Sequence, residues 1–185
     1  MILNYLVITS LILEVIFLAR QNYELKEMLK PASTINQAER LKPGEKVETI
    51  KLNTLDGSTK NLTYNEPSAK YLLFVLSTTC PHCSNNLARW QTIADRCNDE
   101  GFYVVGISIH DLELTRKYIS SKKIGFNLTS CSDSSFTRKY KISAVPETIL
   151  ISGDGTVEKT WVGELTEEQV SEIVGLTSNS SGGTN

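Results

Sequence analysis

The sequence is poor in cysteine and histidine and carries no excess of charge of one sign. Its four cysteines are far too few for a disulfide scaffold, in which cysteine makes up more than about 8–10% of a short secreted chain. The formal net charge of −2 gives no basic face, so we expect no nucleic-acid partner. A chain of 185 residues without an internal repeat is long enough for one domain with a core and an appendage.

The shortage of metal ligands argues against a metal centre or a haem. Zinc takes four protein ligands in structural sites, but the chain has two histidines and a single Cys-x-x-Cys pair, Cys80 and Cys83. The other cysteines, Cys97 and Cys131, stand far apart in the sequence. A c-type haem needs a histidine directly after the second cysteine, and Ser84 stands there. We therefore favour a site without a metal or a cofactor.

The most informative motif that is present is Cys-Pro-His-Cys at residues 80–83. The apolar run Tyr71–Leu76 before it predicts a buried strand. Thr78 and Thr79 are of a type that caps helices, and Pro81 suits the first turn of one. The motif is therefore expected at the N-terminus of a helix that follows a buried strand.

This position favours redox chemistry at the two cysteines. The N-terminus of a helix carries unpaired N–H groups and a partial positive charge, which stabilise a thiolate. We expect Cys80 to be the nucleophile, with a thiol pKa lowered to between about 3.5 and 7.5. His82 is expected to stabilise the Cys80 thiolate further, by its charge or by a hydrogen bond. Cys83 then resolves the exchange, and a redox dithiol is favoured over half of a metal site or a structural disulfide.

A second segment, Ala-Val-Pro-Glu-Thr-Ile-Leu-Ile at residues 144–151, follows the motif and precedes Gly-Asp-Gly at 153–155. In this order the segments resemble the thioredoxin superfamily, and within it the membrane-anchored extracytoplasmic proteins of the TlpA/ResA type. Val-Pro-Glu-Thr-Ile-Leu-Ile resembles the cytochrome c maturation thiol reductases. The resemblance covers residues 43–176. It implies an α/β fold, with a thioredoxin-like mixed β-sheet flanked by helices, and thiol–disulfide oxidoreductase activity without a cofactor.

The same resemblance makes Pro146 a cis-proline that lies against the dithiol; a trans proline that opens a strand is the alternative. The sequence departs from the family at two places. Thr79 stands where an aromatic residue often precedes the first cysteine, and Phe74 is nearest the position of the buried aspartate of thioredoxin. Without that aspartate, water, His82 or Glu147 would have to accept the proton in the second step of thiol–disulfide exchange. Glu147 is instead expected to be a solvated charge at a strand edge.

The N-terminal stretch from Ile2 to Ala19 is nearly all apolar and is closed by Arg20. As a helix it is about 27 Å long, close to the thickness of the hydrocarbon core of a bilayer. A cleaved signal peptide is the alternative, but no basic region precedes the stretch and no Ala-x-Ala site precedes Gln21. We therefore expect residues 1–29 to form an N-terminal transmembrane helix that stays attached.

Two signals disagree about the side of the membrane on which the domain lies. Basic residues usually mark the cytoplasmic flank of a membrane helix, and Arg20, Lys26 and Lys30 lie on the domain side. The resemblance instead implies an extracytoplasmic domain, on the periplasmic or outer face of the cell membrane. We follow the resemblance, because the redox motif agrees with it.

The remaining pattern divides the chain into a linker at residues 30–43, a thioredoxin-like domain at 44–176 and a disordered tail at 177–185. Asp56-Gly57 and the glycines around Asp154 each predict a hairpin. Trp90 lies on the apolar stripe of its helix and is expected in the core. The periodicity predicts hairpin strands at 47–52, 60–64, 147–151 and 157–162, further strands at 71–76, 103–109 and 126–129, and helices at 81–98, 113–122, 135–140 and 166–174, the last capped by Thr166.

The two cysteines outside the motif, Cys97 and Cys131, are expected to be buried small hydrophobes. A bridge between them, or a resolving role for Cys131, stays open at this stage, because spacing in the sequence does not fix a disulfide.

Two functions remain. In the first, the protein is a membrane-anchored thiol–disulfide oxidoreductase that acts on protein thiol or disulfide substrates, such as apocytochrome c or other exported proteins, and is recharged by a membrane electron carrier. In the second, Cys80, Cys83 and His82 hold a soft ion such as Cu(I). Pro-His between the cysteines resembles the oxidant DsbA, whereas the anchor and the Pro-Glu-Thr segment resemble the reductases. We favour the first function, in the direction of a reductase.

Overall fold

The computed structural model describes residues 11–22 and 40–178, apart from 98–100. The chain divides into two units, Met1–Glu39 and Arg40–Asn185. Most of the linker and most of the tail expected from the sequence lie outside the described residues, so these two assignments stay predictions.

In the described part of the second unit, seven strands form one sheet in the order β2-β1-β5-β4-β3-β6-β7. β3 and β4 run parallel, as do β4 and β5, and the other neighbours are antiparallel. The mixed sheet expected from the sequence is therefore confirmed. The strands are β1 (Ile50–Asn53), β2 (Thr59–Leu62), β3 (Lys70–Leu76), β4 (Phe102–Ser108), β5 (Leu128–Ser130), β6 (Glu147–Ser152) and β7 (Val157–Val162).

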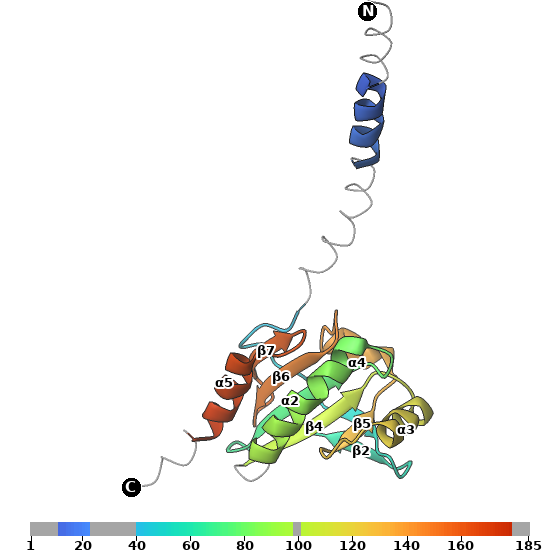
Figure 1. Ribbon diagram of the computed structural model, residues 1–185. Helices are drawn as coiled ribbons and strands as arrows, with labels where there is room; N and C mark the ends of the chain where they lie inside the picture. Colours follow the sequence, from blue (N-terminus) through green and yellow to red (C-terminus); the bar gives the residue numbers. More distant parts are fainter. Residues whose placement is uncertain (1–10, 23–39, 98–100, 179–185) are drawn as a thin grey trace, which may run out of the picture. The chain divides into compact units, whose positions relative to one another are not determined.

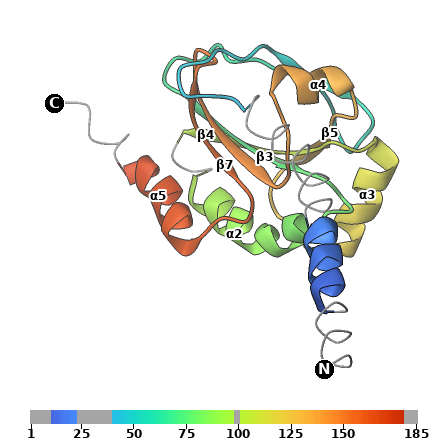
Figure 2. The same ribbon diagram turned by 90° about the horizontal axis from the view of Figure 1, so that it is seen from above.

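Helices cover both faces of this sheet. Those of the second unit are α2 (Pro81–Cys97), α3 (Leu112–Ser121), α4 (Ser134–Lys139) and α5 (Glu167–Ser178). Figure 2 shows α2, α3 and α5 on one face of the sheet and α4 on the other. The core agrees, since α2, α3 and α5 contribute side chains to one apolar cluster and α4 to the second. We name these the α2 face and the α4 face.

The strand before the motif, β3, is buried on both sides from Tyr71 to Leu76, because it is central in the sheet and apolar after Lys70. Its side chains alternate, so that Leu72 and Phe74 join the α2 face while Leu73 joins the α4 face. Trp90 is fully buried on the α2 face, where its ring stacks on Phe74 at 5.1 Å and its Nε1–H donates to Thr148 Oγ1 at 2.8 Å. The core assignment of Trp90 is confirmed.

The predicted turns and caps are also present. β1 pairs with β2 around Asp56-Gly57, and β6 pairs with β7 around the glycines beside Asp154. Thr166 caps α5 reciprocally, because its Oγ1 accepts from the Gln169 N–H and the Gln169 side chain accepts from the Thr166 N–H. The hairpins and the Thr166 cap are therefore confirmed, with strand ends that differ from the predicted ones by three residues at most.

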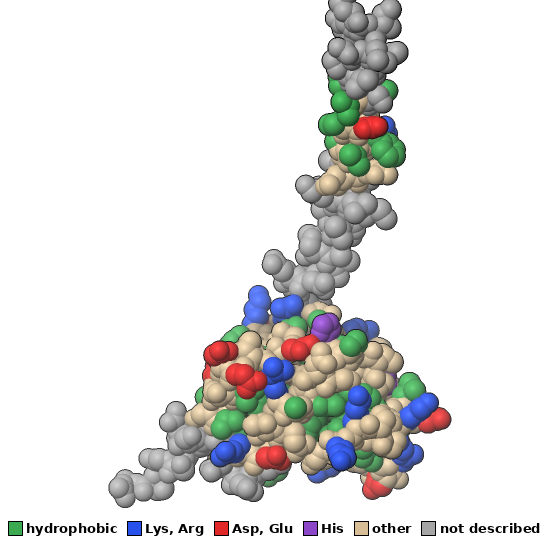
Figure 3. Space-filling model, in the orientation of Figure 1, with side chains coloured by type: hydrophobic (Ala, Val, Ile, Leu, Met, Phe, Trp, Pro, Cys, Tyr) green, Lys and Arg blue, Asp and Glu red, His purple; other side chains and the backbone are tan. Residues whose placement is uncertain are grey.

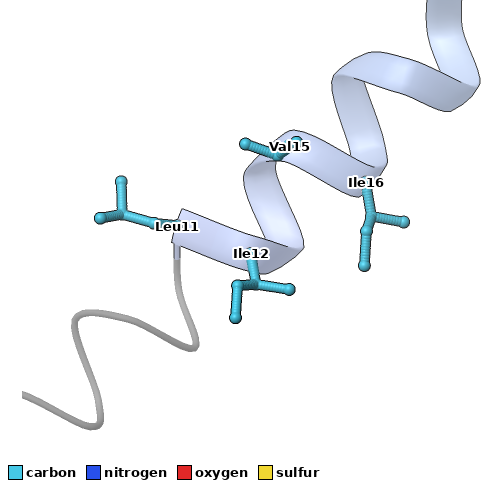
Figure 4. A pocket seen from close by; sticks show the side chains of 4 residues that line it. All are labelled: Leu11, Ile12, Val15 and Ile16. Atoms are coloured by element: carbon cyan, nitrogen blue, oxygen red, sulfur yellow. The ribbon is translucent and has the colours of Figure 1, made fainter.

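The first unit is described only at residues 11–22, which are helical. Figure 4 shows Leu11, Ile12, Val15 and Ile16 projecting from this helix, and each of these side chains is more than half exposed. Among the described residues no helix is long and apolar enough to cross a bilayer. Since residues 1–10 and 23–29 of the expected anchor are outside the described residues, the transmembrane helix stays a prediction.

Candidate active site

The motif occupies the connection between β3 and α2, at the carboxyl edge of the central strand (Figure 1). The Cys80 N–H donates to the Ser77 carbonyl at 3.2 Å, and the Cys80 carbonyl accepts from the Ser84 N–H at 3.3 Å. Pro81 is the first residue of α2, as expected. Cys80 therefore lies immediately before the first helical turn, half-buried, and Cys83 lies within that turn, buried.

The two threonines before Cys80 do not cap the helix through the bonds that the structure shows. Thr79 Oγ1 lies 3.1 Å from Ser77 Oγ, which also accepts from the Thr79 N–H. Thr78 Oγ1 instead bonds to Nδ1 of His110, just beyond the end of β4. No local sequence pattern pointed to His110, because only the parallel pairing of β3 with β4 brings the carboxyl ends of these strands together.

The Val145–Pro146 peptide bond is cis, so the cis-proline implied by the resemblance is confirmed. This peptide lies against the motif, because Cys80 Sγ donates to the Val145 carbonyl at 3.5 Å. Two segments 65 residues apart in the sequence thus form one site around the half-buried sulfur.

The pKa of the Cys83 thiol is raised to about 12, mainly by burial; a backbone hydrogen bond with Ser77 lowers it, and the neighbouring Cys80 thiol adds a smaller increase. Cys83 therefore stays protonated at neutral pH until a reaction at Cys80 draws on it. The two thiols therefore differ in a way that suits thiol–disulfide exchange. Cys80 Sγ is partly accessible to a substrate, and Cys83 Sγ is buried.

The strand position at which thioredoxin has a buried aspartate is apolar here. Phe74 is fully buried and packs between Trp90 and Phe126, at centroid distances of 5.1 and 5.3 Å. A proton acceptor for Cys83 therefore does not come from this residue.

Glu147 is buried, whereas the sequence predicted a solvated side chain. It is 1% exposed, and neither carboxylate oxygen has a hydrogen-bond partner in the described part of the chain. Burial raises the pKa of this carboxyl to about 7, with Arg40 acting in the opposite direction. The prediction of a solvated charge at a strand edge is wrong, because β6 is paired on both sides, through Val75 on β3 and Val162 on β7.

The direction of the Glu147 side chain follows from strand alternation. Ile149 and Ile151 belong to the α4 face, whereas Thr148 reaches Trp90 on the α2 face. Glu147 shares the parity of the two isoleucines and so faces away from α2 and from Cys83. The structure thus gives no contact through which Glu147 takes a proton from Cys83.

His82 lies beside the dithiol but is oriented toward another partner. Its Nδ1 is 2.6 Å from Glu164 Oε1, and its side chain is 70% exposed. Glu164 follows β7, so this contact joins residues 82 positions apart. In the described part of the chain the hydrogen bond of the imidazole goes to Glu164 and none goes to Cys80. A redox role for His82 stays a prediction.

The other two cysteines are buried on opposite faces of the sheet, Cys97 on the α2 face and Cys131 on the α4 face. Cys131 is a free thiol that donates to the Lys51 carbonyl at 3.5 Å, and burial raises its pKa. The structure therefore gives neither a Cys97–Cys131 bridge nor a place for Cys131 as the resolving cysteine. Both residues fit the expected role of buried small hydrophobes.

A family model described as Redoxin matches residues 42–176. The chain belongs to the Redoxin family. Its matched residues contain the whole sheet, the motif and the Val145–Pro146 peptide. Among the residues that the structure describes, no group of three or more side chains is arranged to hold a metal ion.

Relatives of this chain, both curated proteins and proteins of solved structure, are named as thiol–disulfide oxidoreductases or interchange proteins. The chain is 24% identical to sporulation thiol-disulfide oxidoreductase A of Bacillus subtilis, over 65% of this chain and 74% of that protein. It is 25% identical to thiol-disulfide oxidoreductase ResA of Halalkalibacterium halodurans, over 72% and 76% of the two chains. The crystal structure of a thiol:disulfide interchange protein of the thioredoxin family from Chlorobium tepidum aligns with a TM-score of 0.59 and 19% identity, covering 74% of this chain and 97% of that one.

These findings confirm two expectations from the sequence. The fold is thioredoxin-like, and this Redoxin-family protein is a thioredoxin-like thiol–disulfide oxidoreductase.

The buried setting of Cys83 predicts slow alkylation of this thiol. In the Cys80→Ser variant, Cys83 should react with iodoacetamide at about pH 8 about a hundredfold or more slowly in the folded protein than in urea, because each pKa unit above the pH removes about tenfold of the thiolate. Peptide mass spectrometry distinguishes it from the other cysteines. Cys80 in the Cys83→Ser variant is the matched comparison and should label readily while folded. Equal rates for Cys83 in folded and unfolded protein would contradict the assignment.

The buried carboxyl of Glu147 predicts a loss of stability with rising pH. Its pKa in the folded protein, about 7, exceeds the ordinary value of 4.5, so the folded state binds this proton more tightly than the unfolded chain does. Its contribution is complete below about pH 4.5 and is lost as the pH rises to about 7, on the order of 3 kcal/mol at most.

Urea unfolding at about pH 5 and about pH 8 tests this. Glu147→Gln should reduce the difference in unfolding free energy between the two pH values, since the amide does not ionise. Glu113→Gln, which changes an exposed glutamate of α3, is the control and should leave that difference as in the wild type. A Glu147→Gln variant with the wild-type pH dependence would show that the carboxyl is solvated.

Proposed function

We propose that this Redoxin-family protein is a membrane-anchored, extracytoplasmic reductase that uses Cys80 and Cys83 to reduce disulfides of exported proteins. The single observation that carries the proposal is the asymmetric dithiol, a half-buried Cys80 at the start of α2 against the Val145 carbonyl with a buried, protonated Cys83 one turn on.

The exchange follows from this arrangement in two steps. The Cys80 thiolate attacks one sulfur of the substrate disulfide, and the second substrate sulfur leaves as a thiolate that takes up a proton. Cys83 then loses its proton and attacks Cys80 Sγ in the mixed disulfide, which expels the first substrate sulfur. The products are a reduced substrate dithiol and a Cys80–Cys83 disulfide: two electrons pass from the protein to the substrate, and the two substrate thiolates take up one proton lost by Cys83 and one from solvent.

The cis-proline segment supports the proposal from the substrate side. Pro146 places the Val145 carbonyl beside Cys80, where an extended substrate chain would lie across the reacting sulfur. Basic and acidic side chains are interspersed on the face of the domain drawn in Figure 3, so this face carries no extended basic patch of the kind that binds nucleic acid. Apocytochrome c is the substrate suggested by the resemblance, with a membrane electron carrier to reduce the Cys80–Cys83 disulfide after each cycle.

Membrane attachment rests on the apolar sequence from Ile2 to Ala19 and on the exposed apolar side chains of its described part. Seven aliphatic and aromatic side chains between residues 11 and 18 are each more than half exposed. Such a surface is costly in water and favourable in lipid, so it supports an anchor over a solvated helix.

Insulin reduction and mixed-disulfide trapping test the redox function. Cys80→Ser should abolish turnover, because no other described thiol reaches a substrate. Cys83→Ser should accumulate a covalent complex with a disulfide-bonded substrate, since the second step is blocked. Cys131→Ser is the matched control and should retain turnover. A wild-type protein that exchanges no disulfides but binds one Cu(I) per dithiol would instead establish the metal-binding alternative.

A topology reporter tests the location. A topology reporter fused after Asn185 should place that end of the chain outside the cytoplasm, because the anchor is expected to cross the membrane once and the resemblance implies an extracytoplasmic domain. The full-length protein should also remain in the membrane fraction after an alkaline wash. Reporter activity confined to the cytoplasm would show that the basic flank, and not the family resemblance, sets the orientation.

A further inference from the structure

The first two turns of α2 are tied to the connection between β7 and α5 by a stripe of polar side chains. The four residues of the stripe occupy helix positions i, i+3, i+4 and i+7, which share one face. His82 and Asn85 both contact Glu164, with Asn85 Nδ2 donating to Glu164 Oε1 at 3.1 Å. Arg89 pairs with Glu167 at 3.2 Å. The stripe consists of His82, Asn85, Asn86 and Arg89.

Buried hydrogen bonds hold the loop that carries Glu164 in place. Asn86 is fully buried, and its Oδ1 accepts from the Leu165 N–H at 2.9 Å. On the other side, the Gly163 N–H donates to the Pro146 carbonyl at 2.8 Å. The residue between these two anchors is Glu164, so the backbone leaves it little freedom to move away from the dithiol.

Glu164 is held as a carboxylate by its contacts. The hydrogen bond with His82 lowers its pKa most, the bond from Asn85 adds to this, and Arg89 contributes through its charge. The carboxylate therefore binds the imidazole of His82, which stands between the two cysteines in the sequence of the motif. Nδ1 of this imidazole is directed at Glu164, and in the described part of the chain no hydrogen bond joins His82 to Cys80.

This contact matters for the reduction potential of the dithiol. The reduced form carries the Cys80 thiolate, so a cation or an N–H donor beside Cys80 stabilises the reduced form and makes the couple more oxidising. A carboxylate that binds the imidazole withdraws that stabilisation. Resting on the proposed reductase function, we propose that Glu164 is a positioning residue that holds His82 away from Cys80 and so keeps a Cys-Pro-His-Cys dithiol reducing.

The proposal explains why a dipeptide resembling that of an oxidant occurs on a scaffold resembling that of the reductases. Pro-His would raise the potential if the imidazole faced Cys80. Glu164 lies 82 residues further along the chain and supplies the opposing interaction. The redox direction is then set by the pair of residues and not by the motif alone.

A double-mutant cycle on the reduction potential tests the proposal. The equilibrium of each protein with reduced and oxidised glutathione is measured at about pH 6, where free imidazole is largely charged, and at low salt. The proteins are the wild type, Glu164→Gln, His82→Leu and the double variant. Glu167→Gln is the control, since it removes an exposed glutamate that pairs with Arg89 and not with His82.

Glu164→Gln should shift the equilibrium toward the reduced form by about two- to fivefold, the range expected for an exposed ion pair, which corresponds to about 10–20 mV. The shift should be at least halved in the His82→Leu background, because the freed imidazole is then absent. Glu167→Gln should match the wild type. Salt should weaken the shift, as it does for exposed charges.

Two results would overturn the proposal. One is an unchanged equilibrium in Glu164→Gln; the other is an equal shift with and without His82, which would mean that the carboxylate acts on Cys80 directly. Unfolding curves for all variants exclude a change caused by loss of the folded state. Failure of the proposed reductase function is distinguished from failure of this proposal by a different measurement. The wild-type protein would then exchange no disulfides with a substrate, whatever reduction potentials the wild type and the three variants have.

Discussion

The first turn of α2 is fixed against the Val145–Pro146 peptide, and the chemistry of the protein depends on that contact. It leaves Cys80 half-buried beside a carbonyl and puts Cys83 underneath, where burial keeps the thiol protonated. A dithiol with both sulfurs exposed would lack the difference between attacking and resolving thiols. A dithiol with both sulfurs buried would not reach a substrate disulfide. The apolar core maintains the burial of Cys83, because Trp90 of α2 packs on Phe74 of the sheet and so fixes the position of the helix.

Strand directions explain why distant segments meet at this edge. β3 and β4 are parallel and both end there, β6 is antiparallel to β3 and begins there, and β7 ends beside it. Each connection at the edge therefore contributes one element of the site. The turn after β3 gives the motif, the residues after β4 give His110, the start of β6 gives the cis-proline, and the loop after β7 gives Glu164. Hydrogen bonds from Gly163 to Pro146 and from Leu165 to Asn86 join these elements into one unit.

The sequence predicted what local patterns control. The apolar run of β3, the stripe through Trp90 and the glycine turns specify their elements directly, whereas the cis-proline at Pro146 was implied only by the resemblance to the thioredoxin superfamily. The sequence did not predict the setting of Glu147, because its burial depends on pairing with both β3 and β7 and on the covered α4 face. The partner of His82 was also missed, since a contact over 82 positions leaves no periodic signal. Position in the tertiary fold, and not residue type, decided both cases.

The most direct test of the account is the reduction potential of the wild-type protein, measured by glutathione equilibrium with mass spectrometry of the alkylated thiols. The account predicts a single two-electron transition confined to Cys80 and Cys83, at a potential nearer to that of thioredoxin, about −270 mV, than to that of DsbA, about −120 mV. A transition near the DsbA value would contradict the reductase direction. The absence of any transition at these two cysteines would contradict the redox site itself.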